Sequence, residues 1–181
     1  MKKISLIFIS IASLFLFSTN AFALSVSFGI PISHSINDSN IAESDGVSGY
    51  LLGVQLPFLV GLGIDSHETK LKDTNDIKLA TDMYNIFYQL PIPIINLIVG
   101  LGIGNSMLEC DNVGDGTTCS DSYKKGSATQ WYTSIGMPII PFFDIHLSYR
   151  SITSKNIVEK SNDTKLDLSG SVTGVGIAFN F

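Results

Sequence analysis

Charged side chains are missing from five long stretches of the sequence, and this distribution constrains the fold more than any other feature. The stretches are residues 24–36, 46–64, 83–108, 126–143 and 168–181. Within them, large apolar residues alternate with small or polar ones, which predicts β-strands with one apolar face. A water-soluble β-protein carries charges on the solvent face of its strands, so charge-free strands with an aliphatic face favour a hydrocarbon neighbour.

The last stretch shows the alternation clearly. One face carries Val175, Ile177, Phe179 and Phe181, and the other carries Gly174, Gly176, Ala178 and Asn180. Leu166 and Leu168 fall on the opposite phase from Val175. We therefore expect a bulge or a twist near Gly170.

Eight such strands are predicted, covering about residues 24–33, 47–58, 60–65, 79–90, 97–104, 126–137, 143–150 and 166–181. Short turns near residues 57–59, 91–96 and 138–141 hold five of the six prolines, where a missing N–H does not interrupt a ladder. Charged loops, such as residues 66–76 and 151–165, join the other strand ends. Because eight strands close into a sheet whose interior side chains can fill, we predict an all-β fold: a transmembrane eight-stranded antiparallel up-and-down β-barrel.

The first 23 residues resemble a cleaved signal peptide rather than a part of the fold. Lys2 and Lys3 precede an uncharged apolar run at residues 4–17, and Ala21-Phe22-Ala23 supplies a cleavage site. An uncleaved anchor is the alternative, but the run is shorter than the roughly 20 residues that a spanning helix needs. Residues 24–181 then form one barrel domain with a net charge of -7, since nine basic residues face sixteen acidic ones. This acidic balance argues against nucleic-acid binding.

These features resemble the small bacterial outer-membrane β-barrels, namely the OmpA- and OmpX-type domains, the opacity proteins and the OmpW-like barrels. The resemblance rests on the signal peptide, the eight spans, the Tyr149-Arg150 end of the seventh strand and the terminal Phe181. It implies a monomer in the Gram-negative outer membrane, with short periplasmic turns and longer extracellular loops. It also implies that the barrel-assembly machinery recognises the closing strand through Val175, Ile177, Phe179 and Phe181. The further periplasmic domain of OmpA proteins is not expected after Phe181.

The class implies a structural or surface-interaction protein that contacts outer-membrane lipid and lipopolysaccharide and uses no cofactor. A narrow OmpW-like conduit for small apolar solutes is the first alternative, and a lipid A-modifying acyl hydrolase is the second. A soluble lipocalin-type barrel needs apolar residues inside and charged ones outside, which is the reverse of the observed pattern. Enzymatic activity is not the leading expectation.

Polar residues on the inward phase predict an interior network. The predicted members are Gln55, Asn85, Gln89, Gln130, Asp144, His146 and Arg150, with Asp65 as a further inward charge. We expect Asp144 and His146 to bond across the barrel to Gln55, Asn85, Gln89 or Gln130. In the enzymatic alternative, Ser148 attacks an ester, His146 takes its proton and Asp144 is the acidic candidate, as in a His-x-Ser lipid A deacylase. Tyr149 stands where that motif has Asn.

Aromatic residues near both ends of the strands predict interfacial girdles. The upper set is Tyr50, Tyr84, Trp131 and Tyr149, and the lower set is Phe58, Phe143, Phe179 and Phe181. Lys124, Lys125, Arg150 and Lys155 are candidates for contact with lipopolysaccharide phosphates, or they form a solvated loop.

The two cysteines, Cys110 and Cys119, lie in a polar segment of an exported chain and predict a disulfide. A zinc pair is the alternative, but the next histidine in the sequence is His146. Residues 111–122 faintly resemble a calcium loop. Val113 and Ser122 replace expected oxygen ligands, so turn chemistry suffices and we expect no metal.

Overall fold

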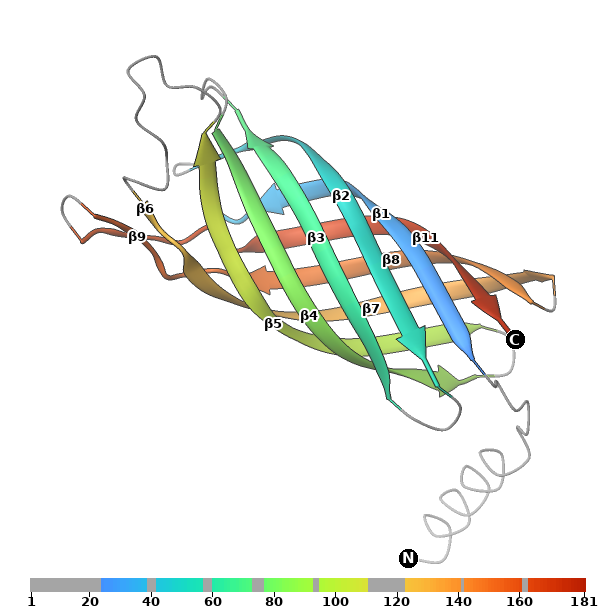
Figure 1. The fold of residues 1–181 in the computed structure, drawn as a ribbon. Helices are drawn as coiled ribbons and strands as arrows, with labels where there is room; N and C mark the ends of the chain where they lie inside the picture. Colours follow the sequence, from blue (N-terminus) through green and yellow to red (C-terminus); the bar gives the residue numbers. More distant parts are fainter. Residues whose placement is uncertain are drawn as a thin grey trace, which may run out of the picture.

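The computed structural model describes residues 24–38, 42–56, 60–72, 77–92, 95–110, 123–140, 142–160 and 163–181. It is a closed barrel of eight strands with a small three-stranded sheet at one end (Figure 1). The barrel strands are β1 (Ser25–Ile36), β2 (Ser44–Gln55), β3 (Gly61–Leu71), β4 (Ile77–Pro91), β5 (Asn96–Cys110), β7 (Gly126–Ile140), β8 (Phe143–Thr153) and β11 (Gly170–Asn180). The small sheet contains β6 (Tyr123–Lys124), β9 (Ile157–Glu159) and β10 (Lys165–Leu166).

Each barrel strand pairs antiparallel with its neighbours, and β1 closes the cylinder against β11. Ser25 lies opposite Asn180, and reciprocal backbone hydrogen bonds of 3.2 and 2.8 Å join Leu24 to Phe181. The predicted eight-stranded antiparallel up-and-down barrel is therefore confirmed. No helix in the described ranges is long and apolar enough to cross a membrane.

The outward face of the barrel carries a continuous apolar belt. We define the belt as the outward side chains of residues 26–32, 50–56, 60–64, 84–90, 97–103, 131–139, 143–149 and 175–181, most of which are exposed apolar residues. In β8, for example, Ile145, Leu147 and Tyr149 are exposed while His146, Ser148 and Arg150 are buried. The predicted alternation is confirmed on these strands. An exposed apolar surface this extensive needs an apolar solvent.

The strands continue well past the belt, at the end opposite the termini. We call this part the extension. Residues 66–76, predicted as a charged loop, lie mostly in β3, where Glu68 and Lys70 are exposed while His67, Thr69 and Leu71 are buried. The loop prediction is wrong for residues 66–71 because the outward face meets water beyond the belt, so charged residues occupy regular strand positions. The charged segment 151–165 likewise contains the end of β8, all of β9 and the start of β10.

The predicted irregularity near Gly170 lies just before that residue. Residues 167–169 separate β10 from β11 and belong to neither strand, and Leu168, Ser169 and Gly170 are buried in succession. From Gly170 to Phe179, β11 pairs with β8 without interruption. A register shift also lies across the sheet, between Pro31 and Ser33 of β1.

A second register shift falls between Pro138 and Ile140, inside the segment predicted as a turn. β7 runs through that segment to Ile140, so the turn prediction placed the strand end too early. The backbone remains extended there because Pro138 sits where the pairing with β8 becomes irregular.

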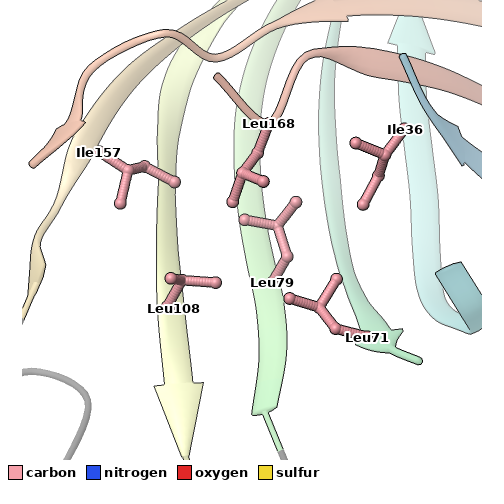
Figure 2. Close-up of a cluster of buried hydrophobic side chains, with 6 residues drawn as sticks. All are labelled: Ile36, Leu71, Leu79, Leu108, Ile157 and Leu168. Carbon is pink, nitrogen blue, oxygen red and sulfur yellow. The ribbon is translucent and has the colours of Figure 1, made fainter. Parts of the chain in front are cut away.

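Side chains fill the barrel along its length. Three inward residues of β4 mark three apolar clusters that follow one another along the barrel. Leu79 belongs to an apolar cluster in the extension, Met83 to a second cluster and Phe87 to a third nearer the termini. The first cluster joins side chains from six elements and segments that converge on the axis (Figure 2): Ile36, Leu71, Leu79, Leu108, Ile157 and Leu168. The second is Met83, Ala128, Ile152 and Val172, and the third is Phe87, Ile98 and Tyr132. Between the second and third lies Asn85, which is polar.

Candidate functional site

The centre of the barrel holds a buried ion pair between β3 and β8. Arg150 Nε donates to Asp65 Oδ2 at 2.8 Å, and Nη2 approaches Oδ1 at 3.4 Å. Both side chains are almost completely buried. Gln130 Nε2 donates to the same Asp65 oxygen at 2.7 Å and to Asn85 Oδ1 at 2.5 Å. Charges buried in this way are tolerated because hydrogen bonds from several strands satisfy them.

Arg150 uses its remaining groups to fill the cross-section. Its Nη1 donates to Ser148 Oγ at 2.6 Å, and its guanidinium carbon lies 4.8 Å from the centroid of the Tyr132 ring. Tyr132 in turn contacts Phe87, with ring centroids 6.4 Å apart. The ion pair is therefore packed directly on the third apolar cluster.

A second polar group lies nearer the termini. Asp144 accepts hydrogen bonds from Asn96 Nδ2 and, at 2.7 Å, from Asn180 Nδ2. His146 Nε2 is 3.8 Å from Asp144 Oδ2, and its Nδ1 is 3.3 Å from Ser134 Oγ. The inward carboxylate of β8 is thus held by amides from β5 and β11.

These contacts correct the predicted pairing of the network. Asp144 and His146 bond to Asn96, Asn180 and Ser134, not to Gln55, Asn85, Gln89 or Gln130. Gln130 instead donates to Asp65, which joins Arg150, and Asn85 accepts a hydrogen bond from Gln130. Gln89 is half-buried, and Gln55 Oε1 is buried without a protein partner. Strand alternation predicts whether a residue faces inward or outward. It does not predict which residue lies opposite it inside the barrel, because that depends on the stagger between strands.

The sequence reasoning missed Asn96, Asn180 and Ser134 as members of the network, although all three are buried. Asn180 and Ser134 share the inward phase of their strands, so parity alone could have found them. Asn96 lies in a segment whose sequence predicts a turn. Its being the one amide within a strongly apolar segment is the feature that could have indicated an interior role.

The arrangement of His146 and Ser148 does not support acyl transfer. Ser148 Oγ donates to the Gly174 carbonyl at 3.2 Å and accepts a hydrogen bond from Arg150, so its contacts are not with His146. Asp144, His146 and Ser148 are all buried inside the barrel. The adjoining pocket, beside Arg150 and His146, has a volume of about 50 Å³. Ligand sites usually measure about 300–1,000 Å³, so this pocket has room for only a few waters.

Inward glycines give the large interior side chains their space. A Cβ at Gly61 would overlap the Phe87 ring, one at Gly100 would overlap the Tyr132 ring, and one at Gly136 would overlap His146. The glycine-rich inner face is therefore filled by bulky residues from neighbouring strands.

Two histidines occupy the extension above the ion pair. His34 Nδ1 lies 2.6 Å from Thr69 Oγ1, and the His34 and His67 rings meet edge to face with centroids 5.8 Å apart. Burial is the main cause that lowers the pKa of each to about 4, helped at His34 by the neighbouring His67. Neutral imidazoles therefore form part of the interior filling at neutral pH.

The predicted girdle residues lie mainly on the outer surface. Tyr50, Tyr84, Trp131, Tyr149, Phe179 and Phe181 are exposed, while Phe143 is half-buried against Phe179. Trp131 and Tyr149 contact each other, with centroids 5.7 Å apart. Phe58 lies outside the described residues.

The predicted lipopolysaccharide contacts and the predicted cysteine and calcium-like sites have different outcomes. Arg150 is buried, so it cannot meet lipopolysaccharide, whereas Lys124, Lys125 and Lys155 are exposed on the extension. Lys124 pairs with Asp163 at 3.8 Å and Lys155 with Asp167 at 3.9 Å. Cys110 ends β5, but Cys119 and the calcium-like segment 111–122 lie outside the described residues, as do residues 1–23, which were predicted as a signal peptide.

Comparison with solved structures identifies the architecture. Neisserial surface protein A matches with a TM-score of 0.63 and 13% identity, over 88% of this chain and 97% of that chain. The chain has the fold of the small outer-membrane β-barrels. OprG of Pseudomonas aeruginosa matches with a TM-score of 0.56 and 12% identity, over 91% of this chain and 98% of that chain. Ail, the attachment invasion locus protein of Yersinia pestis, matches with 0.52 and 16%, over 87% of this chain and 97% of that chain. No protein-family model matches the chain, and no curated protein does.

Proposed function

We propose that this chain is an outer-membrane barrel of structural or surface-interaction type whose interior is sealed. One observation carries the proposal: the Asp65–Arg150 pair and three apolar clusters occupy successive levels of the barrel. A conduit needs a continuous path, and the side chains that block it here interlock with glycines of the wall. The narrow-conduit alternative is therefore disfavoured.

Location in the outer membrane is supported by the apolar belt and by the shared fold. Residues 1–23 would direct export as a cleaved signal peptide, and the closing strand would be recognised by the assembly machinery. The extension would then face outward, with its charged surface available to lipopolysaccharide or to other surface molecules. One similar protein carries attachment and invasion in its name. A bridge between Cys110 and Cys119 would fasten the loop that follows β5.

The acyl-hydrolase alternative has little support, because its candidate residues are buried inside the barrel and Ser148 contacts Gly174 and Arg150 rather than His146. If it were right, lipid A from cells making the protein would lose an acyl chain, and His146→Ala would restore it. Unchanged lipid A is the expected result.

Cell fractionation and surface labelling test the proposed location. The protein should appear in the outer-membrane fraction and migrate differently on a gel before and after heating. In intact cells, a membrane-impermeant amine reagent should label Lys124 on the extension, and Lys124→Arg should lose that label. Recovery in the soluble periplasm would reject the proposal.

A further inference from the structure

The barrel end that carries the termini has an apolar edge without charged side chains, which we call the rim. It consists of the exposed residues Leu56, Val60, Ile92, Met137, Ile139, Ile140, Phe142 and Phe181. Ile139 and Ile140 follow each other in β7 and are 56% and 58% exposed, so both faces of this strand end are apolar. Figure 1 shows the β7–β8 hairpin at this end, near the mark for the C-terminus.

The two ends of the barrel differ sharply in charge. The extension carries exposed ion pairs, such as Lys72–Glu43 at 2.8 Å and Lys78–Glu68 at 3.7 Å. No charged residue occurs in residues 46–64, 83–108 or 126–143, which include all three short turns. The nearest side-chain carboxylate, Asp144, is turned inward and held by Asn96 and Asn180. One end is thus suited to water, and the other is not.

The length of the belt leads to the same conclusion. A transmembrane β-strand needs about 9–11 residues to cross the hydrocarbon layer. In β2 the outward apolar residues extend only from Tyr50 to Leu56, and in β3 only from Ile64 back to Val60. Spanning strands of this length therefore need Leu56 and Val60, the rim residues at the ends of these runs, within the hydrocarbon. The rim continues the belt without an intervening polar row.

Prolines reduce the cost of placing strand ends there. Backbone N–H groups without partners are expensive in lipid, and proline has none. Pro91 ends β4, and Pro138 lies near the end of β7 where its pairing with β8 becomes irregular.

We infer that the rim is a lipid-binding surface that sits within the acyl chains and glycerol region of the nearer leaflet. The family resemblance implied short periplasmic turns at this end; on this account the strand ends at the rim lie within the membrane. The inference rests on the proposed membrane location, but it adds where the barrel stops. Hydrocarbon is its one occupant. If the rim bound a periplasmic protein or a second copy of the chain instead, it would be exposed to water in isolated barrels.

Tryptophan fluorescence can test this, because Trp131 is the single tryptophan. In a Trp131→Phe background, Ile139→Trp and Leu56→Trp report two separate rim hairpins. Leu101→Trp is the belt control, and Lys124→Trp is the control for water on the extension; both parent side chains are more than half exposed. Each variant is reconstituted in phosphatidylcholine vesicles with or without bromine on the acyl chains. Iodide is present on both sides of the bilayer, and heat-modifiable gel migration confirms folding.

The rim variants should lose as much fluorescence to brominated lipid as Leu101→Trp and should resist iodide as well as it does. Lys124→Trp should show the opposite response. If Leu101→Trp is lipid-quenched while both rim variants behave like Lys124→Trp, the inference fails and the membrane location stands. If Leu101→Trp is itself quenched by iodide and not by lipid, the proposed function fails as well.

Discussion

Arg150 of β8 and Asp65 of β3, which are 85 residues apart, form a hydrogen-bonded ion pair of 2.8 Å at the barrel centre. Each charge is buried, so removing one partner leaves the other uncompensated. Asp65→Asn or Arg150→Met should therefore lower the free energy of unfolding by about 3–5 kcal/mol. Denaturant titration of protein folded into vesicles measures this.

The double variant Asp65→Leu/Arg150→Met supplies the control for that pair. Because neither charge remains, it should be less destabilised than the sum of the two single variants. Additive losses would show that the two residues act independently and that the ion pair does not hold the centre together.

Gly61 and Phe87 form an interlocked pair in the wall between β3 and β4. A Cβ at Gly61 would overlap the ring, so Gly61→Ala should destabilise the barrel by about 1–3 kcal/mol through overpacking. In a Phe87→Leu background the same change should cost less, because the smaller side chain leaves space. Equal costs in both backgrounds, measured by denaturant unfolding, would contradict the proposed interlocking.

His34 and His67 should make the extension sensitive to acid. Burial lowers the pKa of each from 6.5 in the unfolded chain to about 4 in the folded one. The unfolded state therefore binds more protons between these values, so stability falls as the pH drops from about 6.5 toward 4. The loss should be on the order of 3 kcal/mol for each histidine.

The measurement compares unfolding free energies at pH 8 and pH 4.5 for the natural chain and for His34→Asn/His67→Gln. Other acidic groups titrate in both proteins, so the difference between them isolates the two histidines. Identical pH profiles would mean that these imidazoles are not buried as neutral groups.

The predicted bridge between Cys110 and Cys119 should order a loop without being needed for assembly. It would close a short segment, so it should contribute about 2 kcal/mol at most. Cys110→Ser should still show heat-modifiable migration in the outer-membrane fraction. Failure of that variant to fold would show that the bridge has a larger role.

The number of strands and their outward faces were predictable because lipid requires an apolar residue at every second position of the belt. The extension was not predictable in this way. There the outward face meets water, so charged residues such as Glu68 and Lys70 occupy strand positions and resemble loop residues in the sequence. The members of the interior network could partly be predicted from parity. Their partners could not, since Arg150 reaches Asp65 through the stagger and closure of the barrel.

The sealed interior is tested most directly by the ionic conductance of the folded natural chain in planar lipid bilayers. Insertion is verified beforehand by the quenching of Trp131 fluorescence by brominated lipid, since Trp131 lies on the outward face of the belt. With Asp65, Arg150, Phe87 and Tyr132 filling the cross-section, the current should remain at the level of the bare bilayer over the applied voltages. Reproducible stepwise currents from the folded natural chain would contradict the account.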